Sequence, residues 1–266
     1  MTMAFVRANG VVLHIADNRR RDAPAIVFGN SLGSDFRIWR DVAERLAGHY
    51  RILLYDKRGH GLSDAPPGPY TIDDHAADLL ALLDHVGIAG TVVVGVSVGG
   101  MVAQRLAGLA PERVKALVLC STAVKIGTPE SWTARIDSVR SGGIASIADA
   151  ILANWFTPGF RRGRGADYEG WRNMLVRTPV EGYVGTCAAL RDADLRAGAG
   201  WIAAPTLCLA GAHDGSTPPD LVRSTANLIP GARFAVIEGA AHIPSVEKPD
   251  VLADLIGNHL REVGHG

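Results

Sequence analysis

Short apolar runs rich in β-branched residues recur along the chain, and several are apolar throughout, which is typical of strands buried on both faces. They lie at Val11–Ile15, Ala25–Phe28, Arg51–Tyr55, Thr91–Val94, Val114–Leu119, Thr206–Leu209 and Phe234–Ile237. Helix-like stretches lie between them, at Asp73–Val86, Val98–Leu109, Pro219–Leu228 and Pro249–His259. This alternation predicts an α/β fold, with a mostly parallel twisted sheet and helices on both faces. A further run, Phe5–Arg7, precedes Ala8-Asn9-Gly10 and Val11–Ile15, which predicts an N-terminal hairpin.

The alternation stops after Cys120, and from about Val124 to Gly198 the sequence is typical of helices joined by glycine-rich segments. The strand pattern resumes at Thr206. An insertion at this point would lie over the carboxyl ends of the strands, where such sheets bind their ligands. We therefore expect an α/β core of residues 1–123 and 198–266, and a helical cap of residues 124–197 inserted after the sixth strand. The alternative is a second helical bundle that does not contact the site.

The balance of charges restricts the class of partner. The chain has 266 residues, of which 47% are hydrophobic, so it can bury a large core. Lys plus Arg and Asp plus Glu are equal at 27 each, and no stretch concentrates one sign. This distribution argues against nucleic acid or a membrane surface as partner and favours a small neutral or singly charged substrate. The oligomeric state is left open by the sequence.

Cysteine and histidine spacing gives no sign of a disulfide framework or a metal site. Cys120, Cys187 and Cys208 are isolated among apolar residues, which predicts buried thiols. None of the nine histidines falls into a close pair, so we expect neither a metal nor another cofactor. The N-terminus has no basic segment followed by a long apolar run, and no stretch is long enough to span a membrane. We therefore expect a cytoplasmic protein.

The segment Gly95-Val96-Ser97-Val98-Gly99 follows an apolar strand and precedes a helix-like stretch. A G-x-S-x-G motif in this context predicts a nucleophilic serine on a tight, strained turn, because the glycines remove Cβ atoms that would collide with the strand and the helix. Ser97 is the candidate nucleophile. A plain Gly/Ser loop is the alternative.

A serine nucleophile needs a base within hydrogen-bond reach and an acid that orients the base. In this arrangement the chain order is serine, acid, histidine. Asp214 and His242 each follow a predicted strand and enter a glycine-containing loop, in that order. We predict that Asp214 is the orienting acid and His242 the general base.

Other residues compete for these roles. His213 precedes the acid, and His60 comes too early in the chain and belongs to a turn. Asp220 begins a helix, where an acid caps or complements the dipole. Glu238 is four residues from the candidate base and is the alternative orienting acid.

Attack on a carbonyl also requires two N–H donors for the oxyanion. One is expected to be the amide of Val98, directly after the nucleophile, and the other that of Leu32, in the loop Gly29-Asn30-Ser31-Leu32-Gly33 after a strand. Ser31 is expected to contact the substrate in a supporting role. A simple glycine turn is the alternative for this loop.

These motifs make the chain similar to the α/β-hydrolase superfamily over nearly its whole length, and within it the chain resembles the 3-oxoadipate enol-lactonases. The motifs that carry the resemblance are Asn30-Ser31-Leu32-Gly33, Asp56-Lys57-Arg58-Gly59-His60-Gly61-Leu62-Ser63, Gly95–Gln104, Thr128–Trp132, Arg177–Tyr183, Asp214–Pro219 and Gly239–Pro244. The cap segments point to the lactonases, whereas the core motifs specify only the superfamily. His213 and Ser245 depart from the pattern expected of relatives.

The resemblance implies a small-molecule substrate, a five-membered enol-lactone that carries a carboxymethyl group, with 3-oxoadipate as the product. A carboxylesterase or another lactonase would share the core residues. A cofactor-free haloperoxidase or perhydrolase would use the same triad with peroxide in place of water. A hydrolase-fold protein that binds a ligand without turnover is the alternative from a different class.

A carboxylate substrate would need a cation in a mainly apolar site. The cap supplies three candidates, Lys125, Arg135 and Arg177. Arg135 lies three residues after Trp132, so on a helix the two side chains share a face. We therefore expect Trp132 and Arg135 to bind the substrate, with a solvated surface arginine as the alternative.

Overall fold

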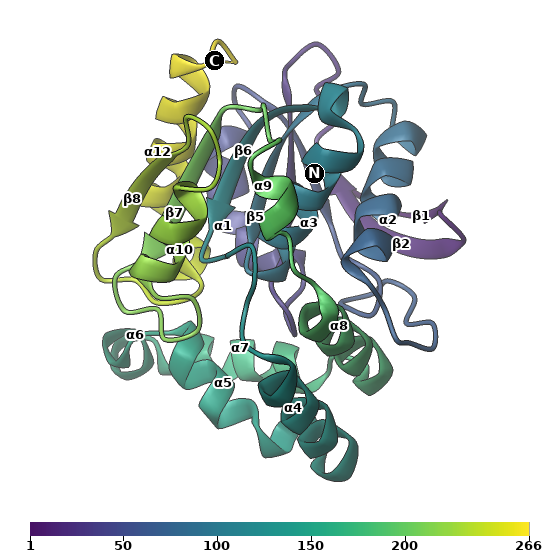
Figure 1. The fold of residues 1–266 in the computed structure, drawn as a ribbon, viewed down its shortest axis with the longest axis vertical. Helices are drawn as coiled ribbons and strands as arrows, with labels where there is room; N and C mark the ends of the chain where they lie inside the picture. Colours follow the sequence, from purple (N-terminus) through teal and green to yellow (C-terminus); the bar gives the residue numbers. More distant parts are fainter. Residues whose placement is uncertain (266) are drawn as a thin grey trace.

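The computed structural model describes residues 1–265 and has an eight-stranded sheet at its centre (Figure 1). The strands are β1 (Thr2–Ala8), β2 (Val11–Asp17), β3 (Ala25–Gly29), β4 (Arg51–Tyr55), β5 (Thr91–Val96), β6 (Val114–Cys120), β7 (Thr206–Gly211) and β8 (Arg233–Ile237). Their order in the sheet is β1-β2-β4-β3-β5-β6-β7-β8. The first two pairings, β1 with β2 and β2 with β4, are antiparallel, and all the others are parallel. The predicted mostly parallel sheet is confirmed.

Helices cover both faces of this sheet, as predicted. The core helices are α1 (Arg40–Leu46), α2 (Ile72–His85), α3 (Val98–Leu109), α9 (Arg196–Ala199), α10 (Pro219–Ala226), α11 (Pro244–Glu247) and α12 (Pro249–Glu262). Successive residues of β3 point to opposite faces: Ile26 and Phe28 pack in the cluster that contains α1 and α12, and Val27 packs in the one that contains α2, α3 and α10. Burial on both faces explains why these strands are apolar throughout.

A helical segment separates β6 from β7 and forms the cap. Its helices are α4 (Pro129–Gly142), α5 (Ala148–Trp155), α6 (Pro158–Gly163), α7 (Gly165–Val176) and α8 (Val180–Asp192). Figure 1 shows α4 to α7 gathered at one end of the molecule, beyond the sheet. Short 3-10 turns, η1 (Phe36–Trp39), η2 (Pro111–Arg113) and η3 (Ile144–Ser146), complete the described structure.

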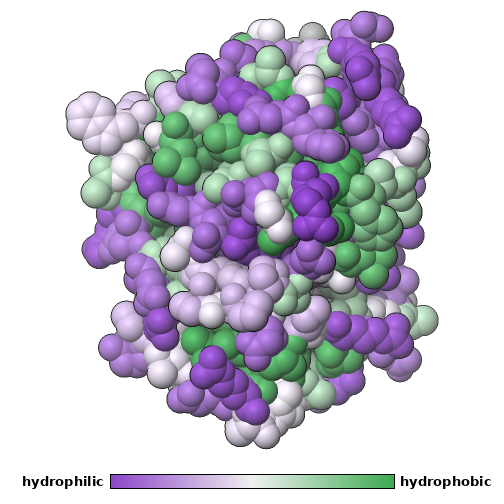
Figure 2. All heavy atoms as spheres, turned by 90° about the vertical axis from the view of Figure 1, so that its right-hand side faces the viewer, coloured by the Kyte–Doolittle hydropathy of each residue, from purple (hydrophilic) through white to green (hydrophobic). Residues whose placement is uncertain are grey.

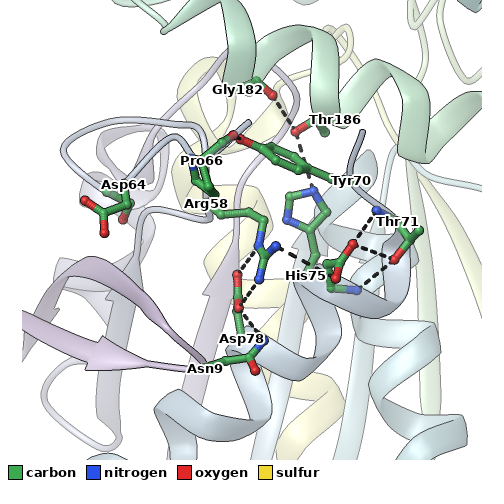
Figure 3. Close-up of polar contacts among 12 residues, drawn as sticks. Asn9, Arg58, Asp64, Pro66, Tyr70, Thr71, His75, Asp78, Gly182 and Thr186 are labelled. Atoms are coloured by element: carbon green, nitrogen blue, oxygen red, sulfur yellow. Dashed lines mark hydrogen bonds and ion pairs between the residues drawn. The ribbon is translucent and has the colours of Figure 1, made fainter. Parts of the chain in front are cut away.

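The cap rests on the core through backbone contacts made by glycines. A Cβ added to Gly182 of α8 would lie 2.1 Å from the carbonyl oxygen of Gly59, which belongs to the loop after β4. One turn further along α8, the Thr186 hydroxyl donates to the Gly182 carbonyl and lies 3.5 Å from His75 of α2 (Figure 3). The helix and the core loop therefore touch more closely than any side chain would permit.

The ends of several elements differ from the prediction. Helix α2 begins at Ile72 instead of Asp73, because Thr71 and Asp74 form a reciprocal capping box in front of it. Helix α12 continues past the predicted end at His259, and α10 stops at Ala226, two residues before the predicted Leu228. Propensity alone leaves such boundaries uncertain by a few residues.

The N-terminal hairpin is confirmed and is longer than predicted. Strand β1 begins at Thr2, and Ala8 belongs to it, which leaves Asn9 and Gly10 as a two-residue turn. Both have positive φ, 46° and 79°, as the preferred hairpin turns require. The hairpin places β1 at the edge of the sheet, where Met3 and Phe5 are exposed.

The surface in Figure 2 is mainly hydrophilic, with hydrophobic side chains in separate areas between the polar ones. The three cysteines are buried and free, as predicted. Among the described residues, no helix is both long and apolar enough to cross a membrane.

The close contact between Gly182 and Gly59 predicts how a methyl group added at position 182 would change the stability of the protein. We expect Gly182→Ala to lower the free energy of unfolding by about 1–3 kcal/mol, because the new Cβ overlaps the Gly59 backbone and forces α8 away from the core. Gly170→Ala in α7 is the matched control, since a Cβ there meets no atom within 4 Å. It should raise stability by about 0.5–1 kcal/mol through helix propensity. Denaturant unfolding measures both; equal changes would contradict the packing argument.

Candidate active site

Ser97 lies on the turn between β5 and α3. Its φ of 58° and ψ of −123° are rare for a residue with a side chain. A Cβ added to Gly95 would lie 2.3 Å from the Gly99 carbonyl oxygen, so the turn can form only because both flanking positions are glycine. The turn holds the serine between the end of a buried strand and the first turn of a buried helix.

The end of β3 lies directly against the same helix. A Cβ added to Gly99 would lie 2.3 Å from the Gly29 carbonyl oxygen. The loop that follows Gly29 is therefore held beside the N-terminus of α3. Val98, at this N-terminus, is fully buried, and Ser31 and Leu32 of the loop line the same cavity as Ser97.

Asp214 and His242 form a buried pair. His242 Nδ1 lies 2.9 Å from Asp214 Oδ2, so in neutral His242 the Nδ1 hydrogen is donated to the carboxylate and Nε2 is left as an acceptor. The carboxylate also accepts the backbone N–H groups of Ser216 and Thr217 and the Thr217 hydroxyl. Burial acts to raise the pKa of Asp214, but His242 and these hydrogen bonds outweigh it, and the pKa lies below its ordinary value.

The two loops that carry this pair are joined by backbone contacts. Strands β7 and β8 are parallel neighbours, so their carboxyl ends meet at the same edge of the sheet. The amide of His213 donates to the Ala240 carbonyl. A Cβ added to Gly211 would lie 2.0 Å from the Ala241 carbonyl oxygen, so only glycine permits this approach.

Ser97 and His242 line one cavity of about 220 Å³ beneath the cap. The residues that line it are Ser31, Leu32, Ser97, Ile126, Gly127, Ser131, Trp132, Arg135, Ile151, Asn154, Trp155, Tyr183, Gly215, Ser216 and His242. Among these described residues Arg135 is the single Lys or Arg, and there is no Asp or Glu. Within residues 1–265, no three His, Cys, Asp or Glu side chains are grouped closely enough to hold a metal ion.

The three candidate cations of the cap occupy different environments. Arg135 lines the cavity, and its guanidinium lies 5.0 Å from the centre of the Trp132 ring. Lys125 donates to the carbonyls of Arg191 and Ala193, away from the cavity. Arg177 is exposed and lines a separate hollow. Only Arg135 is therefore placed to meet a ligand beside Ser97.

The structure separates the rival residues from the cavity. His60 is fully buried, and its Nε2 accepts the Gly33 amide at 2.9 Å. His213 and Glu238 are exposed. Asp220 lies in the first turn of α10 but makes no capping hydrogen bond. Its charge therefore complements the helix dipole, and its side chain does not cap the helix.

Sequence reasoning missed three contacts that hold the His242 loop. Thr217 donates to Asp214, and the spacing Asp-x-x-Thr could have suggested this contact, because an aspartate often accepts amides two and three residues later. Glu247 accepts the Ala241 amide and both the amide and the hydroxyl of Thr157, which joins the loop to the cap. The amide of His242 donates to the Asn154 carbonyl at the end of α5. Nothing local in the sequence indicates the last two.

Comparison with known proteins gives one family. A family model described as alpha/beta hydrolase fold matches residues 24–140. The chain is 38% identical to 3-oxoadipate enol-lactonase 2 of Acinetobacter baylyi, over 91% of this chain and 90% of that protein. It is 31% identical to 3-oxoadipate enol-lactonase 1 of the same organism, over 98% of each. Among solved structures, the enol-lactonase from Burkholderia xenovorans LB400 is similar with a TM-score of 0.94 and 37% identity, covering 97% of this chain and all of that one.

The lowered pKa of Asp214 predicts a pH-dependent role for Thr217. A carboxyl whose pKa is depressed in the folded state contributes stability above its unfolded pKa, and this contribution is lost as the pH falls through the folded value. Thr217→Val removes one hydrogen bond to the carboxylate, so it should lower the free energy of unfolding more at pH 6 than at about pH 2.

Thr206→Val is the control for this measurement. Thr206 is also buried, but its hydroxyl donates to the Ala204 carbonyl, which does not titrate. Thr206→Val should lower the free energy of unfolding by the same amount at both pH values, as measured by chemical unfolding. If Thr217→Val lowered the free energy of unfolding equally at both pH values, the hydroxyl would not act through the Asp214 charge.

Proposed function

Because the chain belongs to the α/β-hydrolase family, we propose that it is a serine hydrolase that opens the ring of 3-oxoadipate enol-lactone to give 3-oxoadipate. The observation that carries this substrate is the place of Arg135 in the same cavity as Ser97 and His242. A cation with no carboxylate among the described lining residues is suited to the free carboxylate of the substrate, and a planar guanidinium can bind it through two hydrogen bonds. The enol-lactonase relatives support the same choice.

The proposed reaction begins with attack by Ser97 Oγ on the lactone carbonyl. His242 Nε2 takes the serine proton, and Asp214 holds the ring and stabilises its positive charge. The carbonyl oxygen becomes an oxyanion, which the N–H groups of Leu32 and Val98 would stabilise. Collapse breaks the ring C–O bond, and the leaving oxygen takes the proton from His242 Nε2 to give an enol, which becomes the ketone. The enol leaves more readily than an amine, so acid assistance matters less than in a protease.

The second half of the reaction releases the product. Water gives its proton to His242 and attacks the acyl group on Ser97, and the restored serine takes a proton back. No metal or other cofactor is required for either half. The cavity of about 220 Å³ is smaller than the usual range for drug-sized ligands, which favours a compact lactone over a bulky ester.

The direct test is to incubate the protein with the enol-lactone and follow the loss of its ultraviolet absorbance. Ser97→Ala should lower kcat on the order of a thousandfold or more, because the nucleophile is lost, and the fold should be retained. Ser138→Ala, at an exposed serine of α4, should keep wild-type activity. Ser97→Ala activity within tenfold of wild type would exclude the serine mechanism.

Arg135→Ala tests the substrate class. It should weaken binding of the carboxylated lactone by about 2–4 kcal/mol and barely change hydrolysis of a neutral aryl acetate, because only the first substrate presents a carboxylate. Arg140→Ala, on the exposed side of the same helix, is the matched control and should change neither. Equal losses on both substrates would mean that Arg135 supports the cap fold, and a general carboxylesterase would then describe the protein better.

A further inference from the structure

Lys57 is a buried lysine that the proposed reaction does not use. It follows β4 by two residues and is 2% exposed. Lysine is almost never fully buried unless it is paired, because desolvation of its charge costs free energy. Its Nζ donates to the Ser31 carbonyl at 2.6 Å. Burial lowers the pKa of Lys57 well below its ordinary value. Methionine would fill the same space without this cost, so packing alone does not explain a lysine here.

The Ser31 carbonyl is an unusually crowded acceptor. Besides Lys57 Nζ, it accepts the Ser34 hydroxyl at 3.0 Å and the Ser34 amide at 3.3 Å. A carbonyl has two lone pairs, so three donors converge on one oxygen. Donors on a carbonyl draw electron density through the amide and make the N–H of the same peptide a stronger donor.

That N–H belongs to Leu32, the expected oxyanion donor. The Ser31–Leu32 peptide is trans, so its C=O and N–H point in opposite directions. The C=O points to Lys57, which does not line the cavity, whereas Ser31 and Leu32 do line it. The Leu32 N–H therefore points away from the lysine, and we expect it to face the cavity that Ser31 and Leu32 line.

The segment that carries Lys57 is held rigidly. Arg58 forms two hydrogen bonds of 2.6 Å with Asp78 of α2, and Asn9 donates to the same carboxylate (Figure 3). The next residue, Gly59, is pressed against α8 of the cap. His60 accepts the Gly33 amide, and Lys57 donates to the Ser31 carbonyl. These two side chains of the loop after β4 thus bind two consecutive peptide groups of the loop after β3.

We infer that Lys57 is a positioning residue that aims and polarises the Leu32 N–H for the oxyanion, by donating to the carbonyl of the same peptide. This role rests on the proposed function, because it needs an oxyanion formed at Ser97. It makes Lys57 a determinant of transition-state stabilisation with no contact to the substrate.

The test compares Lys57→Met with Arg51→Met. Arg51 is a buried cation at the other end of β4, paired with Asp17 and far along the strand from the loop of Leu32. Both changes should lower the melting temperature. Lys57→Met should lower kcat for the lactone on the order of tenfold or more with KM changed less than about threefold, whereas Arg51→Met should keep kcat.

The second readout is inhibition by trifluoroacetone. In its adduct the Ser97 oxygen bonds to the carbonyl carbon, the serine proton goes to His242, and the C=O electron pair becomes an oxyanion. Lys57→Met should weaken this inhibition in proportion to its loss of kcat, and 3-oxoadipate, which forms no oxyanion at the serine, should inhibit wild type and variant equally. A general structural defect would weaken both inhibitors.

The outcomes separate this inference from the proposed function. Wild type that neither hydrolyses the lactone nor binds trifluoroacetone would overturn the proposed function. Wild type that does both, with Lys57→Met unchanged in kcat or in trifluoroacetone inhibition, would overturn only the role of Lys57. If Lys57→Met does not fold, Ser34→Ala removes another donor from the same carbonyl and should show the same pattern to a smaller degree; unchanged inhibition there also overturns the inference.

Discussion

The site depends on a backbone contact without side chains, where the first turn of α3 meets the ends of β3 and β5. Gly29, Gly95 and Gly99 allow this approach, because a Cβ at Gly95 or Gly99 would overlap a neighbouring carbonyl. The same contact forces Ser97 into its positive φ and brings the Leu32 loop beside the helix N-terminus. Backbone strain of this kind persists only where the surrounding packing over-determines it. Here the packing is a buried sheet on one side and a buried helix on the other.

Around this contact, the polar groups of the site are supported in layers. The Asp214 carboxylate accepts four hydrogen bonds, one of them from the His242 ring, which fixes the ring and its tautomer. The Leu32 loop is held from behind by Lys57 and His60. Such support matters because a reacting group misplaced by even about 1 Å can lose much of its effect. In the proposed reaction, the buried polar side chains behind the site therefore contribute to its chemistry as well as to its stability.

Much of the fold could be predicted, because strands buried on both faces have an apolar signature that does not depend on tertiary contacts. The positions of Ser97, Asp214 and His242 after strands could be predicted, and the structure has all three in segments that follow the carboxyl ends of parallel strands. Helix ends were less predictable, as α2 shows, because its start depends on side-chain capping by Thr71 and Asp74. The contacts of Glu247 and Lys57 could not be predicted, since their partners lie far away in sequence.

The hydrogen bonds between the end of α5 and the His242 loop limit how the cap can be exchanged. The amides of His242 and Ile243 donate to the carbonyls of Asn154 and Trp155, and Glu247 adds a tie to Thr157. The cap is thus not an independent module that could be transplanted onto another hydrolase core to import a new specificity. A functional chimaera would have to carry the His242 loop along with the cap. The segments exchanged together would thus come from two separate parts of the sequence.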